Sequence, residues 1–164
     1  MIDDVETTLK RVPDLEQVDF AHVTAERLGG LTNRNYKITA PIGTFVLRIP
    51  GEGTSEYISR ENESLAARIA SEVGVNAPLL YFDARDGVQL TRFIDGAATM
   101  NVERFKDLGS VRRAAQSLRR VHDCGRPFNN RFELFQMIDE YLDFLAKKQA
   151  PLPDGYHDVK REAE

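Results

Sequence analysis

Residues 28–36 read Leu-Gly-Gly-Leu-Thr-Asn-Arg-Asn-Tyr, two glycines followed by small amide and hydroxyl side chains. The stretch lies between two strand-like segments. Glycines allow tight turns and leave room for a ligand, and Thr32, Asn33 and the loop amides can donate hydrogen bonds to phosphoryl oxygens. The stretch therefore predicts a phosphate-binding hairpin. The alternative is a plain hairpin turn without a ligand, because Gly-Gly and Asn-rich turns are common between strands.

Three antiparallel strands are predicted around this loop. Residues 20–28 are expected to form the first strand, and residues 35–40 and 44–49, which alternate apolar and polar side chains, the second and third. In the third strand Arg48 lies on the face opposite to the apolar side chains. That face can point beneath the glycine loop.

A helix and two further strands follow the three strands. Apolar spacing predicts a helix over residues 57–73 and a leading helix over residues 4–12. Strands are expected at 79–83 and 88–94, around Asp86-Gly87, which is a strong hairpin signal. The order predicts an α+β fold with a five-stranded antiparallel sheet.

The second half of the chain reads as helical. Residues 95–98 are small and form a joint, after which helices are expected at 108–122 and 133–148. Asp158 resembles the N-cap of one more helix, so the chain stops as that helix begins.

Composition narrows the class of protein. With 164 residues, a net charge of −4 and a pI near 5.5, the chain lacks the basic balance of a nucleic-acid-binding protein. Its arginine cluster at 112–120 is interpreted as a solvated helix face. The single cysteine, Cys124, excludes an intrachain disulfide and favours a reducing, cytoplasmic setting. No apolar run approaches the roughly 20 residues of a membrane span.

Several enzyme classes are not supported by the motifs. Three scattered histidines and one cysteine give no compact pair of nucleophile and base, and there is no cysteine and histidine spacing for structural zinc. The sequence Gly-x-x-x-x-Gly-Lys-Ser/Thr, which forms the other common phosphate loop, does not occur.

A glycine hairpin, a basic residue on the third strand and an acidic residue on the next helix follow the order of a kinase-like N-terminal lobe. Residues 29–36, 45–51 (Phe-Val-Leu-Arg-Ile-Pro-Gly) and 60–63 (Arg-Glu-Asn-Glu) resemble the choline/ethanolamine kinase family, within the aminoglycoside phosphotransferase group. The likeness continues through residues 91–96 (Thr-Arg-Phe-Ile-Asp-Gly) and spans most of the chain.

This resemblance implies a division into two parts. Residues 1–94 would be the kinase-like N-terminal nucleotide-binding lobe, and residues 95–164 the hinge and the first helices of an incomplete helical C-terminal lobe. It also implies phosphorylation of a small alcohol, choline before ethanolamine, with ATP and Mg²⁺.

Roles of individual residues follow from the same resemblance. The loop would cover the ATP phosphates, Arg48 would grip them, and Glu63 would hold Arg48 by an ion pair. Glu61 is an alternative partner for Arg48, and Glu63 is preferred from the Arg-x-x-Glu spacing that the family shows. Residues 91–94 would offer backbone groups to adenine. The residues carried over as cofactor-binding are Gly29, Gly30, Thr32, Asn33, Asn35, Arg48, Glu63, Thr91, Phe93 and Ile94.

Each role has a simpler alternative. Arg48 could be an exposed cross-strand charge and Glu63 a surface helix residue. For this pair the functional interpretation outweighs the simpler one because of the motifs on either side.

The sequence departs from the family in its chemistry. The family's catalytic loop has the form His-x-Asp, four residues, Asn, and a later Asp binds magnesium. Here His122-Asp123 and His157-Asp158 place the Asp directly after His. We therefore assign no catalytic or metal-binding residue, expect the metal ligands in the missing C-terminal part and expect this chain alone to be inactive. Helices meant to pack on a missing lobe would expose apolar surface and favour homo-oligomers.

Other functions remain open from the sequence. The chain could be a non-catalytic module that binds nucleotide or a protein partner, or part of a kinase for an aminoglycoside or thiamine. Choline is preferred because the loop and strand motifs are most similar to that branch of the group.

Overall fold

A computed structural model of the protein describes residues 3–131 and 133–164. By its contacts the chain forms two compact units, Met1–Asn129 and Asn130–Glu164, and each is described by itself. The lobe boundary that the sequence suggests at residue 94 falls inside the first unit and stays a prediction.

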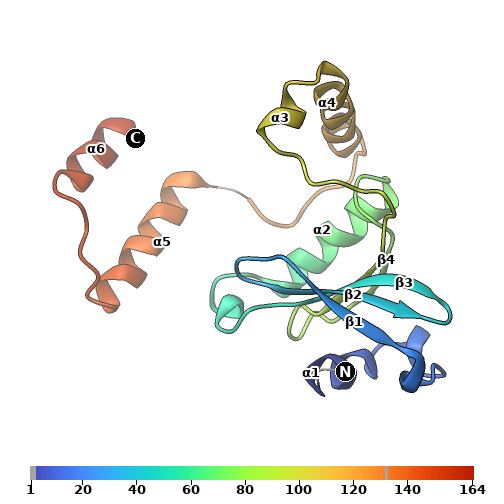
Figure 1. The fold of residues 1–164 in the computed structure, drawn as a ribbon. Helices are drawn as coiled ribbons and strands as arrows, with labels where there is room; N and C mark the ends of the chain where they lie inside the picture. The colour runs from blue at the N-terminus through green and yellow to red at the C-terminus, as the bar shows by residue number, and fades with distance from the viewer. Residues whose placement is uncertain (1–2, 132) are drawn as a thin grey trace. The chain divides into compact units, whose positions relative to one another are not determined.

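The first unit is built on a five-stranded sheet in which every neighbouring pair is antiparallel (Figure 1). The strands follow the order β1-β2-β3-β5-β4. They are β1 (Thr24–Leu28), β2 (Arg34–Ala40), β3 (Gly43–Ile49), β4 (Leu79–Phe82) and β5 (Gln89–Arg92). This confirms the predicted α+β class and the antiparallel sheet.

The predicted first strand begins too early. Residues Phe20–His22 form a 3-10 turn, because the Asp19 side chain accepts a hydrogen bond from the backbone N–H of Ala21. The strand starts only at Thr24. The last strand is shorter than expected at both ends, Gln89–Arg92 instead of 88–94.

One face of the sheet is covered by the N-terminal segment. Helix α1 (Asp3–Leu9) and the 3-10 turn Pro13–Leu15 direct apolar side chains onto the apolar face of the strands. The buried side chains of this core include Val5, Leu9, Val12, Leu15, Ile38, Phe45, Leu47 and Leu90. Burying each such side chain stabilises a fold by about 1.5–3 kcal/mol, so the contact between this segment and the sheet contributes substantially to stability.

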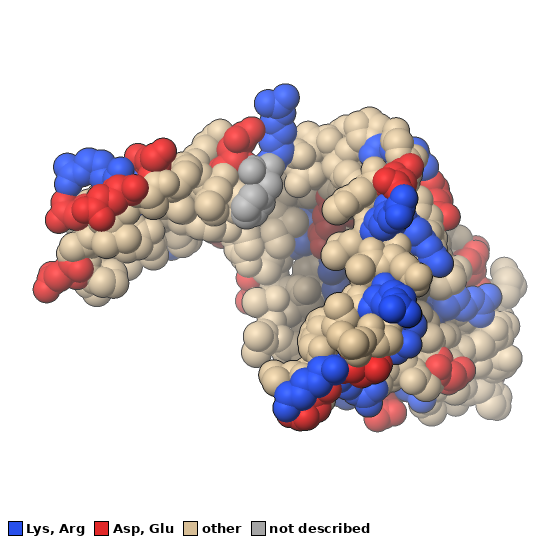
Figure 2. All heavy atoms as spheres, turned by 90° about the horizontal axis from the view of Figure 1, so that it is seen from above, with Lys and Arg blue, Asp and Glu red and all other residues tan. Residues whose placement is uncertain are grey.

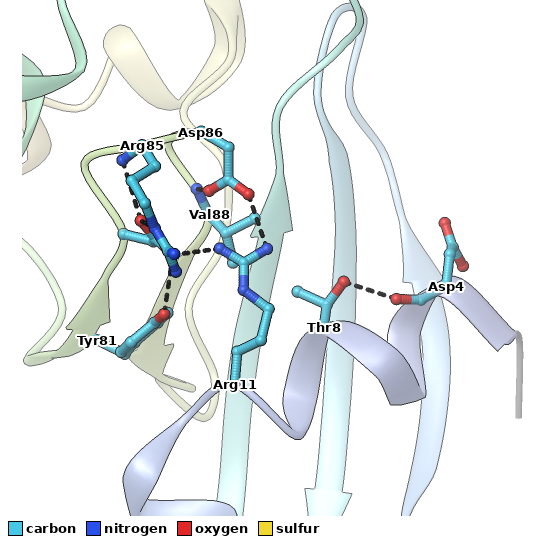
Figure 3. A network of polar contacts seen from close by, with 8 residues as sticks. Asp4, Thr8, Arg11, Tyr81, Arg85, Asp86 and Val88 are labelled. Atoms are coloured by element: carbon cyan, nitrogen blue, oxygen red, sulfur yellow. Dashed lines mark hydrogen bonds and ion pairs between the residues drawn. The ribbon is translucent and has the colours of Figure 1, made fainter.

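A clasp of charged residues fixes the end of this segment to the β4–β5 hairpin (Figure 3). Arg11 forms ion pairs with Asp83 and Asp86, the latter at 2.7 Å. Asp83 is buried and also accepts hydrogen bonds from Arg85 and from the Tyr81 hydroxyl at 3.2 Å. We call Arg11, Asp83 and Asp86 the N-terminal clasp.

Helix α2 (Arg60–Glu72) lies on the side of the sheet opposite to α1 (Figure 1). It starts three residues later than predicted, because Thr54–Glu56 form a 3-10 turn and Ser59 caps the helix by accepting from the N–H of Asn62. Ile69 of this helix is fully buried.

Two more helices complete the first unit, α3 (Val102–Phe105) and α4 (Leu108–His122). The sequence predicted α4 with these bounds and missed α3. The side chain of Asp107 caps α4 by accepting from the N–H groups of Gly109 and Ser110, which explains its sharp start.

Two arginines of α4 lie in local ion pairs on the surface. Arg119 pairs with Asp123 at 3.0 Å, and Arg113 lies 3.8 Å from Asp107. Figure 2 shows Lys and Arg side chains interspersed with Asp and Glu side chains over the face that it presents. These pairs agree with a solvated face.

The second unit holds α5 (Leu134–Lys147) and α6 (Tyr156–Ala163). Lys160 of α6 lies 3.1 Å from Asp139 of α5. Helix α6 starts after Gly155, whose positive φ of 77° turns the chain into the helix, so the prediction of Asp158 as N-cap was wrong. Within the described residues, none of the helices has the length and apolarity that a membrane crossing requires.

Candidate phosphate-binding site

The glycine loop between β1 and β2 is closed by its own polar groups. The Asn35 side chain donates a hydrogen bond to the Gly29 carbonyl at 3.0 Å. A Cβ atom on Gly30 would lie 2.5 Å from the Asn33 carbonyl oxygen, so a side chain there would break this closure. Asn35 and Gly30 therefore hold the loop in shape.

Other parts of the loop are open to a ligand. A Cβ atom on Gly29 would meet nothing within 4 Å, and Leu31 at the tip is fully exposed. Thr32 is exposed and Asn33 is half-buried. The hydroxyl of Thr32 and the amide of Asn33 lie where the sequence placed the phosphate donors, and their binding role stays a prediction.

Arg48 lies beside the residue that closes the loop. In the β2–β3 ladder Arg48 is opposite Asn35, and in the β3–β5 ladder it is opposite Gln89. Paired residues of antiparallel strands project to the same face, so these three polar residues form one row across the sheet. Phe45 and Leu47 of β3 are buried on the other face, as predicted.

Glu63 is the partner of Arg48. A Glu63 carboxylate oxygen, Oε1, accepts from Nη2 of Arg48, and both side chains are about one-fifth exposed, 22% and 21%. Glu61 of the same helix is exposed. The structure thus confirms the predicted ion pair and its preference for Glu63, because position 63 of α2 is the one that turns toward β3.

The Arg48 guanidinium has an unused buried donor. Its Nε is buried and has no hydrogen-bond partner among the described residues. A buried polar atom left unpaired costs about 1–3 kcal/mol, so an acceptor bound beside Arg48 would stabilise the site. Phosphoryl oxygens are acceptors of the required charge.

The turn after β3 supports the loop, a contact that no sequence pattern indicates. A Cβ atom on Gly51 would lie 2.1 Å from the Thr32 carbonyl oxygen, so the turn packs directly on the loop. The hydroxyl of Thr54 donates to the Gly51 carbonyl at 2.7 Å and accepts from Arg60. Both Gly51 and Arg60 stand in the motifs that resemble the family, but no spacing rule assigns them a role.

The predicted adenine segment lies at the end of β5. Thr91 is buried opposite Val46, and Ile94 is 53% exposed. The N–H of Phe93 donates to the Thr44 carbonyl at 3.0 Å, and Lys37 Nζ lies 4.6 Å from the centre of the Phe93 ring. An adenine contact at Phe93 would use its carbonyl oxygen, since its N–H is engaged. Adenine binding here stays a prediction.

The described residues do not provide a metal site. Nowhere in residues 3–131 and 133–164 do three or more His, Cys, Asp or Glu side chains gather as metal ligands would. The carboxylate of Glu63 is shared between two arginines, which leaves it a poor magnesium ligand.

A family model described as choline/ethanolamine kinase matches residues 25–163. The chain belongs to the choline/ethanolamine kinase family. Among relatives, protein LicA of Haemophilus influenzae is 30% identical over 123 residues, which are 75% of this chain and 36% of that protein.

Solved structures agree with this family and fold. A choline/ethanolamine kinase family protein from Mesorhizobium loti is 45% identical, with a TM-score of 0.74 over 98% of this chain and 51% of its own. The choline kinase LicA from Streptococcus pneumoniae is 24% identical, with a TM-score of 0.77 over 96% of this chain and 54% of its own, which shows the fold alone. This member of the choline/ethanolamine kinase family thus spans about half or less of the length of these relatives.

Proposed function

We propose that this chain supplies the nucleotide-binding lobe of an ATP-dependent kinase that phosphorylates a small alcohol. The observation that carries the proposal is the Arg48–Glu63 ion pair, set one strand away from the residue that closes the glycine loop. A half-buried arginine oriented by a carboxylate, beside a loop of small residues, suits a polyphosphate.

The residues of the chain would act by binding and orienting. The guanidinium of Arg48 stays charged at every physiological pH and can donate through its unpaired Nε to a phosphoryl oxygen. Glu63 holds that guanidinium in place. The loop amides and the Thr32 hydroxyl would donate hydrogen bonds to the phosphate oxygens.

Choline, with ethanolamine second, is the proposed alcohol. The family model supports this class, and so does the 45% identical structure from Mesorhizobium loti, which is described as a member of the same family. The residues around Arg48 face the nucleotide end of the reaction and do not distinguish one alcohol from another. A cytoplasmic location, where ATP is available, is part of the same proposal.

We further propose that these 164 residues alone do not transfer the phosphoryl group. The motif His-x-Asp followed by four residues and Asn, which supplies the base in this group of kinases, does not occur in them. The described residues also lack a carboxylate cluster for Mg²⁺, so no step of the reaction is assigned to a metal here. The alternative, a module that binds nucleotide without catalysis, predicts the same binding.

Calorimetric titration with ATP and magnesium tests the binding proposal. Arg48→Ala should weaken ATP binding strongly, while Arg68→Ala, on the exposed side of the same helix α2 that carries Glu63, should leave it unchanged. Unaltered binding in Arg48→Ala, or no binding by the natural chain, would overturn the proposal. Turnover of ATP with choline by the 164-residue chain would overturn the claim of inactivity.

The chain is also proposed to pair with a second copy of itself. Helix α4 exposes an apolar row that includes Leu108, Val111 and Leu118, with Leu108 79% exposed. These residues recur at helical spacing on one face. An exposed apolar stripe on a helix is stabilised by burial against a matching stripe, which a second copy provides.

A further inference from the structure

Arg60, at the start of α2, is buried although it is charged. Only 7% of the residue is exposed, and arginines are rarely buried unless their donors are paired. Its three donor groups reach three different side chains. Nη1 donates to Glu63 at 2.7 Å, Nε to the Ser55 hydroxyl at 3.1 Å, and Nη2 to the Thr54 hydroxyl.

The surrounding structure makes room for this guanidinium. A Cβ atom on Gly87, in the β4–β5 hairpin, would lie 2.8 Å from both Cδ and Nε of Arg60. Gly87 has a positive φ of 81°, so glycine serves both the turn and the space for Arg60. The Arg60 side chain therefore passes between α2, the turn after β3 and the hairpin.

From Arg60 one set of contacts leads to Arg48. Glu63 gives one carboxylate oxygen, Oε2, to Arg60 and the other, Oε1, to Arg48. With both oxygens engaged, the carboxylate cannot rotate without breaking a charge-assisted hydrogen bond. Arg60 thus sets the direction in which Glu63 holds Arg48.

A second set of contacts leads from Arg60 to the glycine loop. Thr54 accepts from Arg60 and donates to the Gly51 carbonyl at 2.7 Å. Gly51 in turn packs against the Thr32 carbonyl, with no room between them for a methyl group. Arg60 therefore fixes the turn on which the loop rests.

Building on the proposed function, we propose that Arg60 is a positioning residue for the phosphate end of the nucleotide. It does so by holding Glu63, and through it Arg48, and by holding the Gly51–Thr54 turn beneath the loop. Removing the Arg60 guanidinium should make both the Glu63–Arg48 pair and the Gly51–Thr54 turn more mobile. Polyphosphate binding should then weaken, while the affinity for the adenine end of the nucleotide should not change.

The first test needs no ligand. The variant Arg60→Met of the 164-residue chain keeps the length of the side chain and removes its donors. Amide hydrogen exchange is measured in it for residues 29–35 and 51–54. Exchange in both segments should rise about tenfold, while the matched variant Arg68→Met on α2 should exchange like the natural chain. Unchanged exchange in Arg60→Met would overturn the inference.

The second test separates positioning from general destabilisation. Dissociation constants are measured for MgATP and for adenosine. Arg60→Met should raise the constant for ATP about tenfold and leave that for adenosine within about twofold. An equal loss for both ligands, or no loss for ATP, would overturn the inference.

A second variant keeps the test decisive if Arg60→Met does not fold. Thr54→Val removes only the hydroxyl that joins Arg60 to Gly51, and Thr54→Ser restores it. Thr54→Val should weaken ATP binding and Thr54→Ser should not; equal binding by both would count against the inference. Failure of the natural chain to bind ATP would overturn the proposed function as well. ATP binding that depends on Arg48 but not on Arg60 or Thr54 would overturn the positioning role alone.

Discussion

Asp83 of the β4–β5 hairpin forms an ion pair with Arg11, which lies 72 positions earlier in the chain. The side chain of Asp83 is only 5% exposed. Hydrogen bonds from Arg85 above all, and also from Arg11 and the Tyr81 hydroxyl, hold the pKa of Asp83 well below its usual range, although burial acts in the opposite direction. The N-terminal segment is therefore attached to the sheet by a carboxylate that must stay ionised.

Acid should weaken the fold through Asp83. Its pKa is lower in the folded chain than the value of about 3.9 expected when unfolded, so the ionised form stabilises the fold above that value. The stabilisation is lost progressively as the pH falls below about 4 toward the folded-state pKa. Asp83→Asn should lower the free energy of unfolding at pH 7 by about 1–3 kcal/mol and flatten its dependence on acid. Denaturant unfolding from pH 7 to pH 2.5 measures both effects.

Asp14→Asn is the matched control for this prediction, because Asp14 is exposed in the same N-terminal segment. It should unfold like the natural chain at pH 7. An Asp83→Asn protein with the full acid sensitivity of the natural chain would show that other carboxylates govern this behaviour.

Glu63→Gln should weaken ATP binding about tenfold, because the amide keeps the shape but leaves Arg48 and Arg60 without the charge between them. Glu61→Gln changes a carboxylate two positions away that is exposed, and it should bind ATP like the natural chain. Calorimetry decides between them. Equal affinities for the two variants would contradict the role of the Arg48–Glu63 pair.

Alanine substitutions at two glycines near the loop should have different effects, one on stability and the other on ATP affinity. Gly51→Ala places a methyl group 2.1 Å from the Thr32 carbonyl oxygen and should destabilise the fold by about 1–3 kcal/mol. Gly29→Ala meets nothing within 4 Å, so stability should stay within about 0.5 kcal/mol, while ATP affinity falls because the methyl group occupies the approach of the phosphates. Thermal melting and titration separate the two. Full ATP affinity in Gly29→Ala would place the phosphates elsewhere.

Self-association should depend on the apolar row of α4. Light scattering over a range of concentrations should show dimers of the natural chain, and Leu118→Gln, at a side chain that is 61% exposed, should shift the equilibrium toward monomers. Gln116→Ala on the same helix is the control. A monomer at every concentration would rule out pairing through this helix.

The sequence predicted best what short-range signals determine. Helix α4 has the expected bounds because an acidic cap and an apolar row mark it locally. The Asp86-Gly87 hairpin and the alternation in β2 and β3 were equally direct signals. The Arg48–Glu63 pair followed from the spacing in the motif that resembles the family.

What the sequence could not predict depends on partners far apart in the chain. Arg11 shows no local pattern that points to Asp83, and nothing around Arg60 indicates that Gly87 leaves space for it. From the sequence, Gly51 stands only at the end of a motif that resembles the family. Its second role, as the support of the glycine loop, appears only once the sheet brings residues 32 and 51 together.

The N-terminal segment is synthesised before the strands that it covers, and β5 is the last of those strands to be made. Its apolar side chains share one buried core with Leu90 of β5. Arg11 can pair with Asp83 only once the β4–β5 hairpin has been synthesised. At about 5–20 residues per second, the 72 positions between Arg11 and Asp83 take roughly 4 to 14 s to synthesise. During that time the apolar side chains of the segment can pack only on strands made earlier, such as Ile38 of β2 and Phe45 of β3, so the charged attachment through Arg11 is the last of its contacts to become available.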